Sequence, residues 1–98
     1  MKPLATKFRS NGFEFNQVMR AGNVALFAKT KPSIRSINYE VIIVQSHNGY
    51  EIAGKTFEPA ETYPPSESWG RLGWSFMDQE SAKGKFDEIS SEINCHSF

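Results

Sequence analysis

The order of apolar and polar residues along the chain predicts a series of β-strands. Residues 13–16 alternate with a period of two, which is typical of a strand with one buried face. The alternation slips at residues 17–19, and such a slip predicts a β-bulge. A turn at residues 21–23 leads to a second apolar run at residues 24–28. The two runs are therefore expected to form a hairpin.

The middle of the chain contains its most β-prone run, residues 39–44. Consecutive aliphatic residues from Val41 to Val44 predict a central strand that is covered on both faces. The Asn48-Gly49 pair that follows favours a hairpin turn, because Asn and Gly tolerate positive φ angles. Residues 50–57 are then expected to form a fourth strand with a bend at Gly54.

The last third of the chain changes from a strand period to a helical period. After a long loop, residues 72–76 alternate as a fifth strand. Asp78 is a favourable N-cap for a helix, and Glu80 suits the positive end of its dipole. Apolar residues then recur at steps of three and four, which forms the stripe of an amphipathic helix. They are Ala82, Phe86, Ile89 and Ile93.

These patterns predict an α+β fold, in which an antiparallel β-meander of about five strands carries one C-terminal amphipathic helix on one face. Residues 1–11 are expected to be a flexible N-terminal arm, residues 12–94 a single α+β domain, and residues 95–98 a frayed tail. A chain of 98 residues is long enough for one hydrophobic core.

The sheet face opposite the helix also needs cover. One solution is that Trp69 and Trp74 fold over it, and the other is a symmetric homodimer through that face. Trp74 lies in a strand pattern and is expected in the core. For Tyr63 and Trp69, which lie in the loop, packing over the sheet and contact with a partner both stay open.

The net charge of zero conceals an uneven distribution of charge. Residues 1–35 contain seven basic residues and one acidic residue, whereas residues 36–98 contain four basic and ten acidic residues. The split predicts either a basic face for an acidic partner or two halves that neutralise each other in the fold.

Several features point to the cytoplasm. No apolar run approaches the roughly 20 residues that span a bilayer, so no membrane partner is expected. The first residues lack the apolar segment of a secretory signal. Cys95 is the single cysteine and has no partner for an internal disulfide, which fits a reducing compartment.

Residues that typically build catalytic or metal sites are scarce. The two histidines are His47, in a turn, and His96, beside Cys95 near the end of the chain. The Cys95-His96 pair lies on the expected frayed tail, where a catalytic role is not expected, and no second Cys or His has the spacing of a metal site. Glycine-rich phosphate-binding motifs are also missing from the sequence. The sequence therefore predicts that the protein is not an enzyme and uses no cofactor and no metal.

Binding of a protein partner is the favoured function. Basic residues flank one end of the predicted sheet, and the loop at residues 58–71 is expected at the same end. That loop supplies Tyr, Trp and Arg, the types enriched in interface cores. The predicted partner-binding residues are Lys29, Lys31, Arg35, Tyr63, Trp69 and Arg71. The alternative is single-stranded nucleic acid held by the basic loop and the aromatic segment, although Glu58, Glu61 and Glu67 in the same loop would repel phosphate.

A set of short motifs between about residue 13 and residue 89 carries a family resemblance. The more specific ones are Tyr-Pro-x-Ser-Glu-x-Trp-Gly at residues 63–70 and Gly-Trp-x-Phe at residues 73–76. The others lie at residues 22–27, 30–31, 39–41 and 50–54 and at Ala82 and Phe86. In these motifs the chain resembles a family of small uncharacterised proteins of tailed bacteriophages.

The resemblance implies a phage accessory protein that acts in the cytoplasm of the bacterial host. By analogy with other small phage proteins, the expected function is to bind and modulate or inhibit a host bacterial protein, as anti-CRISPR and other anti-defence proteins do. The resemblance implies no catalytic residue for this chain.

Overall fold

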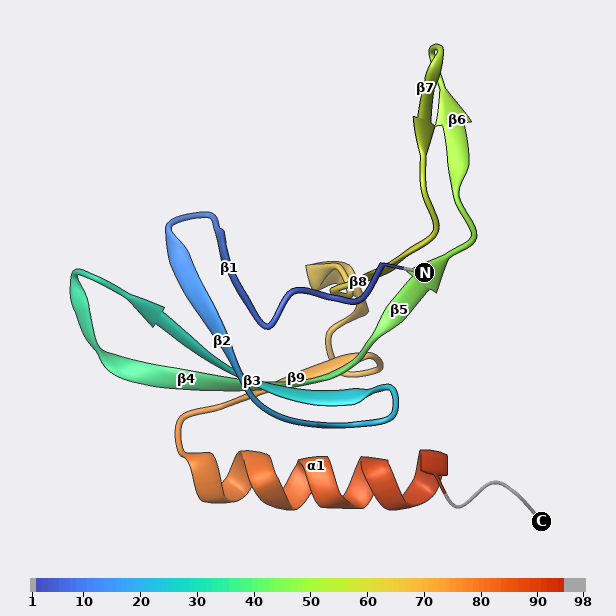
Figure 1. The fold of residues 1–98 in the computed structure, drawn as a ribbon. Helices are drawn as coiled ribbons and strands as arrows, with labels where there is room; N and C mark the ends of the chain where they lie inside the picture. Colours follow the sequence, from blue (N-terminus) through green and yellow to red (C-terminus); the bar gives the residue numbers. More distant parts are fainter. Residues whose placement is uncertain (1, 95–98) are drawn as a thin grey trace.

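The structure, a computed structural model, describes residues 2–94, apart from the side chains of Ser66 and Asn94 (Figure 1). In chain order its elements are β1 (Lys7–Ser10), β2 (Phe13–Ala21), β3 (Val24–Lys31), β4 (Ile34–Ile43), β5 (Gln45–His47), β6 (Tyr50–Ile52), β7 (Lys55–Phe57), β8 (Ala60–Thr62), the 3₁₀ helix η1 (Ser66–Ser68), β9 (Gly73–Phe76) and α1 (Gln79–Asn94). The predicted frayed tail at residues 95–98 lies outside the described residues.

The main sheet is antiparallel and has five strands in the order β1-β2-β3-β4-β9. The helix α1 runs along one face of this sheet and contacts β3, β4 and β9 (Figure 1). The predicted α+β class, with an antiparallel sheet and a C-terminal helix on one face, is confirmed. The predicted bulge is confirmed as well, because the register between β2 and β3 shifts between Gln17 and Met19.

The apolar stripe of α1 forms the first hydrophobic core with the sheet. Ala82, Phe86 and Ile89 are buried against Val24, Leu26 and Val41. Burial of a side chain as large as Phe86 contributes about 1.5–3 kcal/mol. The helix begins as predicted, since the Ser81 N–H donates to the Asp78 carboxylate at 2.7 Å and so caps the first turn.

Part of the N-terminal segment forms a strand where a flexible arm was predicted. Residues 7–10 form β1, which pairs with β2 and stacks the Phe8 ring on that of Phe15 at 4.8 Å. Asn11 and Gly12 both have positive φ, 52° and 82°, as the central residues of a tight hairpin turn require. This turn folds the segment back on β2, so the expectation of a loose arm is wrong for β1.

Residues 50–57 do not form the predicted fourth strand of the sheet. A turn at Ala53 and Gly54, with φ values of 51° and 81°, reverses the chain, so β6 and β7 pair with each other. The place beside β4 in the main sheet belongs to β9 instead. Asn48 and Gly49 also do not close a hairpin, because they join β5 to β6, and β5 pairs with β8.

The sheet face opposite α1 is covered by the chain itself. Its core consists of Phe15, Ala25, Phe27, Ile42 and Val44, and the N-terminal segment and the loop before β9 pack over them. Trp69 contributes to this cover, as one of the two expectations had it. Trp74 instead packs on the helix side, where the Lys85 ammonium lies 4.8 Å from its ring centroid. A homodimer is therefore not needed to cover this face.

Candidate functional site

A buried carboxylate, that of Glu40, stands at the centre of the helix-free face. Glu40 lies in β4 opposite Phe27 of β3 and Ser75 of β9, and it is only 6% exposed. The Tyr63 hydroxyl donates to its Oε1 at 2.6 Å. Its Oε2 receives longer contacts from the Lys29 ammonium, at 3.5 Å, and from the Ser75 hydroxyl, at 3.4 Å. The carboxylate thus joins three segments that are distant in the sequence.

Tyr63 is the donor that fixes one side of this carboxylate. Its ring meets those of Phe8, Phe15 and Phe27 edge to face, with centroids 5.5–5.6 Å apart. Burial among these rings, together with the nearby Glu40 charge, raises the pKa of Tyr63 above its usual range. The phenol therefore keeps its proton at neutral pH and acts as a hydrogen-bond donor.

Trp69 completes the cluster from the loop before β9. Its indole Nε1–H donates to the Ser75 hydroxyl at 2.8 Å, and Ser75 in turn donates to Glu40. The indole lies flat on the backbone at Gly73, so closely that a Cβ there would come within 2.6 Å of the ring. A glycine at position 73 is what allows the ring to lie over β9.

Between these segments lies a cavity of about 650 Å³. The rings of Phe8, Phe15 and Trp69 line it together with the polar groups of Lys29 and Glu40. Within residues 2–94 there is no group of three His, Cys, Asp or Glu side chains that could hold a metal ion. The residues that line the cavity can offer hydrogen bonds, the Lys29–Glu40 ion pair and aromatic surface to a ligand.

Three of the six predicted partner-binding residues meet at this cavity, namely Lys29, Tyr63 and Trp69. Lys31 lies beside them, with its ammonium 5.3 Å from the Phe13 ring centroid. Arg35 is exposed just beyond the turn that joins β3 to β4.

Arg71 lies elsewhere, and the expectation that the loop at residues 58–71 shares one end of the sheet with Lys31 and Arg35 is wrong. Gly73 pairs with Ile42, whereas Lys31 pairs with Ile34, so Arg71 is close to the opposite end of β4. Only the fold of the loop back over the sheet brings Tyr63 and Trp69 to Lys29.

Glu40 is not among the residues predicted from the sequence, although one signal for it is present there. Glu40 alternates with Ile42 and Val44, so it occupies a position on the same strand face as two buried aliphatic residues. A carboxylate in that position requires donors nearby. Its donors Tyr63 and Ser75 come from the folded-back loop and from β9, and no local pattern reveals either placement.

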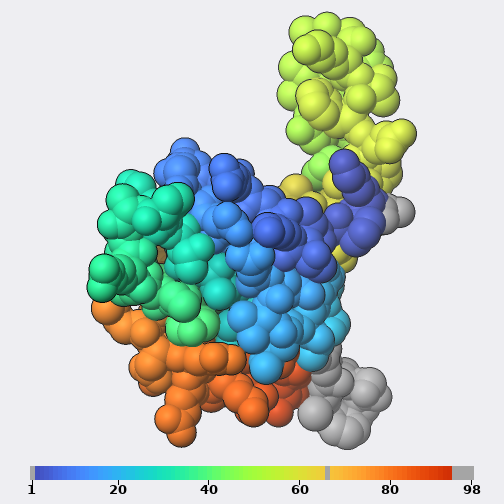
Figure 2. Space-filling view, turned by 60° about the vertical axis from the view of Figure 1, so that its left-hand side comes forward, coloured from blue at the N-terminus to red at the C-terminus, as the bar shows by residue number. Residues whose placement is uncertain are grey.

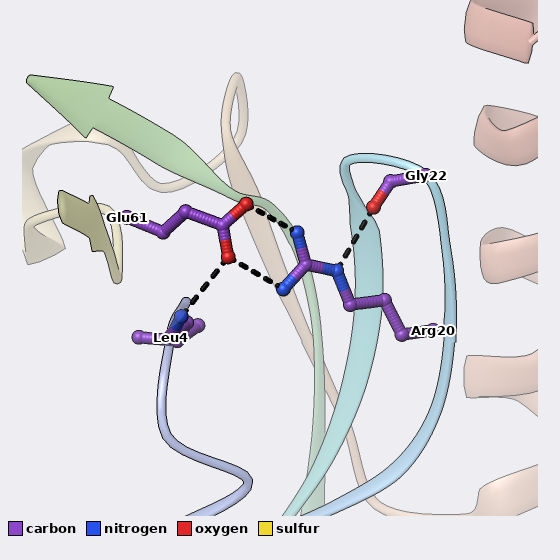
Figure 3. Close-up of polar contacts among 4 residues, drawn as sticks. All are labelled: Leu4, Arg20, Gly22 and Glu61. Atoms are coloured by element: carbon purple, nitrogen blue, oxygen red, sulfur yellow. Dashed lines mark hydrogen bonds and ion pairs between the residues drawn. The ribbon is translucent and has the colours of Figure 1, made fainter. Parts of the chain in front are cut away.

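A second polar contact ties the N-terminal segment and β8 to the main sheet (Figure 3). The Arg20 guanidinium donates to both oxygens of Glu61, at 2.7 and 2.8 Å, and Glu61 also accepts the Leu4 N–H at 2.9 Å. Arg20 donates further to the Gly22 carbonyl at 2.9 Å. Two parallel hydrogen bonds between guanidinium and carboxylate fix geometry as well as charge.

The Arg20–Glu61 contact predicts a pH dependence of stability. The Arg20 hydrogen bonds, followed by that of Leu4, lower the pKa of Glu61 from its usual 4.5 to about 2. Because the folded-state pKa is lowered, the contact stabilises the fold above pH 4.5 and loses this contribution as the pH falls toward 2. We expect Glu61→Gln to cost about 1–2 kcal/mol at pH 7, since both side chains stay partly exposed and water screens them.

Urea unfolding of both proteins between pH 7 and pH 2 measures this dependence. The difference in unfolding free energy between wild type and Glu61→Gln should shrink as the pH falls below 4.5. A difference that is constant over that range would show that Glu61 does not titrate with a lowered pKa.

The hairpin of β6 and β7 stands away from the rest of the molecule (Figures 1 and 2). The Tyr50 and Phe57 rings stack at 4.7 Å, and Ile52 shares their face of the hairpin because it lies two positions from Tyr50. These three side chains are 46%, 42% and 61% exposed. Lys55 pairs with Ile52 and lies on the same face, whereas Glu51 and Thr56 form the opposite, polar face. The hairpin thus presents an apolar surface that residues 2–94 do not cover.

Comparison of the chain with family models, with curated proteins and with solved structures finds no match. Among the described residues, no helix is long and apolar enough to cross a membrane.

Proposed function

We propose that this chain is a non-enzymatic binding protein that docks the apolar face of its β6–β7 hairpin on another protein. The observation that supports this function is the exposure of Tyr50, Ile52 and Phe57 together on an element that projects into solvent. Contiguous exposed apolar surface is typical of interaction sites.

The short strands of the hairpin and its lack of further strand partners within residues 2–94 favour docking over a structural role. Within the part of the chain that the structure describes, β6 and β7 are three residues long and pair only with each other. A lone two-stranded hairpin is at best marginally stable in water. Contact with a partner would bury its apolar face and stabilise the pairing at the same time. Tyr is also among the residue types that dominate interface energetics.

The proposed partner is a host bacterial protein, and the proposed setting is the bacterial cytoplasm. Both follow from the resemblance to small proteins of tailed phages, and an inhibitor of the anti-CRISPR or other anti-defence type is the corresponding function. A projecting apolar hairpin fits a groove or pocket on such a protein.

The six residues predicted from the sequence take different parts in this proposal. Lys29, Tyr63 and Trp69 support the fold around Glu40, so their removal would change stability as well as any contact. Arg35 and Arg71 are exposed and Lys31 is half-buried. Arg71 is proposed as a contact at the rim of the interface, where charges steer association more than they add affinity. Lys31 and Arg35 lie at the end of β4 that is remote from the hairpin, so they are proposed to act only through long-range steering.

Two substitutions on opposite faces of the hairpin test the docking surface. Ile52→Gln places a polar amide in the apolar face, and Thr56→Gln places the same uncharged side chain on the polar face, opposite Glu51. We expect Ile52→Gln to reduce capture of the partner from bacterial lysate by about tenfold or more, because a polar amide buried in an interface without hydrogen-bond partners is costly. Thr56→Gln should capture the partner as wild type does.

The measurement is quantitative mass spectrometry of proteins retained on the immobilised chain. Thermal unfolding of both variants serves as the control, and each melting temperature should stay within a few degrees of wild type because both positions are exposed. Equal capture by the two variants would exclude the apolar face as the docking surface.

A further inference from the structure

The cavity on the helix-free face has the size and lining of a small-ligand site. Its volume of about 650 Å³ is typical of pockets that hold small molecules. Aromatic rings form its walls: Phe8 and Phe15 come from β1 and β2, and Tyr63 and Trp69 come from the loop before β9. A ligand in this cavity would meet flat apolar walls and the polar groups of β3 and β4.

These polar groups place a hydrogen-bond acceptor beside a donor. Glu40 Oε2 and the Lys29 ammonium are 3.5 Å apart, and Ser75 reaches the same oxygen at 3.4 Å. Both distances exceed the roughly 2.7–2.9 Å of a strong charge-assisted hydrogen bond. A carboxylate oxygen accepts more than one hydrogen bond and an ammonium donates three, so both groups retain capacity for a ligand.

This pair of groups selects against simple ions. A cationic ligand at Glu40 would meet the Lys29 ammonium, and an anionic ligand at Lys29 would meet the Glu40 carboxylate. A neutral group that carries an N–H beside a carbonyl or ring nitrogen would satisfy both. The edges of nucleobases carry such neighbouring donors and acceptors.

The walls suit the flat faces of the same ligands. The Trp69 indole lies against Gly73 and nearly parallel to the Tyr63 ring, with the ring centroids 6.3 Å apart, and both rings line the cavity. Nucleobases stack on aromatic side chains of this kind. Lys31 follows two residues after Lys29 on the same face of β3, close to Phe13, where its ammonium can meet a phosphate linked to the base.

We propose that this cavity binds a nucleobase, whose N–H edge donates to Glu40, whose neighbouring acceptor receives a hydrogen bond from Lys29, and whose ring lies against the aromatic walls. The base belongs either to a free nucleotide or to a single strand. This site is separate from the β6–β7 hairpin, so its test and the test of hairpin docking can fail independently.

Nitrogen-15 NMR offers a direct readout, because the two tryptophans give two indole N–H signals on opposite sheet faces. The probes are guanosine and cytidine 5′-monophosphate, and ribose 5-phosphate is the control without a base. We expect both nucleotides to shift the Trp69 indole signal in a saturable manner at millimolar concentrations. The Trp74 signal, from the helix side, should not move.

Substitutions at the two polar groups test the proposed contacts. Glu40→Gln and Lys29→Gln should each weaken nucleotide binding by about tenfold, which is the loss of one hydrogen bond to a charged group. Glu51→Gln, on the hairpin, should bind as wild type does. An unshifted Trp74 signal in each variant verifies that the fold is intact, and Lys29→Gln provides the test if Glu40→Gln does not fold.

A short single-stranded oligonucleotide distinguishes the two sources of the base. Much tighter binding than that of the mononucleotides, with a steep dependence on salt, identifies a single strand as the ligand. Equal affinity identifies a free nucleotide. The proposal is overturned if ribose 5-phosphate shifts Trp69 as strongly as the nucleotides do, if no nucleotide or oligonucleotide shifts it, or if both Gln variants at the site bind as wild type does.

Discussion

Replacement of Glu40 by Ala is expected to lower the melting temperature by roughly 10–20 °C, which corresponds to about 2–3 kcal/mol in a domain of this size. The substitution leaves the buried Tyr63 hydroxyl without its acceptor at 2.6 Å and the Lys29 ammonium without its counter-charge. Loss of one partner from a buried polar cluster costs more than the net value of the contact, because the remaining groups stay desolvated. Lys29 is a quarter exposed and can turn to water, which limits the loss.

Two comparisons make the Glu40 result specific. Glu51→Ala removes an exposed carboxylate from the hairpin and should change stability by less than about 0.5 kcal/mol. Tyr63→Phe removes only the hydroxyl and should cost about 1.5 kcal/mol, less than Glu40→Ala because the carboxylate keeps its contacts with Lys29 and Ser75. Calorimetric unfolding of the three variants should therefore rank Glu40→Ala as the least stable. If Glu40→Ala unfolded at the temperature of Glu51→Ala, the carboxylate would not anchor this face.

Gly73→Ala and Gly84→Ala are expected to shift stability in opposite directions. At position 73 a Cβ would come within 2.6–2.8 Å of three atoms of the Trp69 ring, which the Ser75 hydrogen bond holds in place. The ring would have to leave its position over β9, and we expect a loss of about 1–3 kcal/mol. At position 84, in the exposed part of α1, a Cβ meets no atom within 4 Å. There Ala should stabilise the helix by about 1 kcal/mol.

Urea unfolding compares the two glycine variants under the same conditions. A neutral Gly73→Ala variant would contradict the close approach of Trp69 to the β9 backbone. A destabilising Gly84→Ala variant would contradict the exposure of that position. Both variants add the same methyl group, so the difference between their unfolding free energies reports the surroundings of the two positions.

The fold class could be predicted because the spacing of hydrophobic residues distinguishes strands from the helix. The steps of three and four through Ala82, Phe86 and Ile89 identify α1, and the phase slip after Gln17 identifies the bulge. Both features depend only on neighbours in the sequence. β1 contains one aromatic residue, Phe8, among polar residues, so its sequence shows no strand periodicity. Its pairing depends on the tertiary contact between Phe8 and Phe15.

The β6–β7 hairpin shows how one local conformation changes the topology. A bend at Gly54 was predicted, but the turn also needs Ala53 at a φ of 51°, which alanine rarely adopts. No residue preference signalled that conformation. Once the chain reverses there, the place beside β4 is left to β9, and the strand order of the sheet follows.

Prediction of the candidate sites was limited even more by contacts between residues that are distant in the sequence. The sequence singled out Lys29, Tyr63 and Trp69, and the structure places them around one cavity. Their common centre is Glu40, and the pairing of β4 with β9 that brings Ser75 to it cannot be inferred from either strand alone. Arg71 was assigned to the wrong end of the sheet for the same reason.

Amide hydrogen exchange of the chain, alone and in complex with the captured host protein, tests the docking of the hairpin most directly. In the free chain the amides of residues 50–57 should exchange rapidly, because this short, exposed hairpin opens easily. In the complex we expect these amides to be the most strongly slowed of the whole chain. Unchanged exchange at residues 50–57, with protection confined to another surface, would contradict the proposed function.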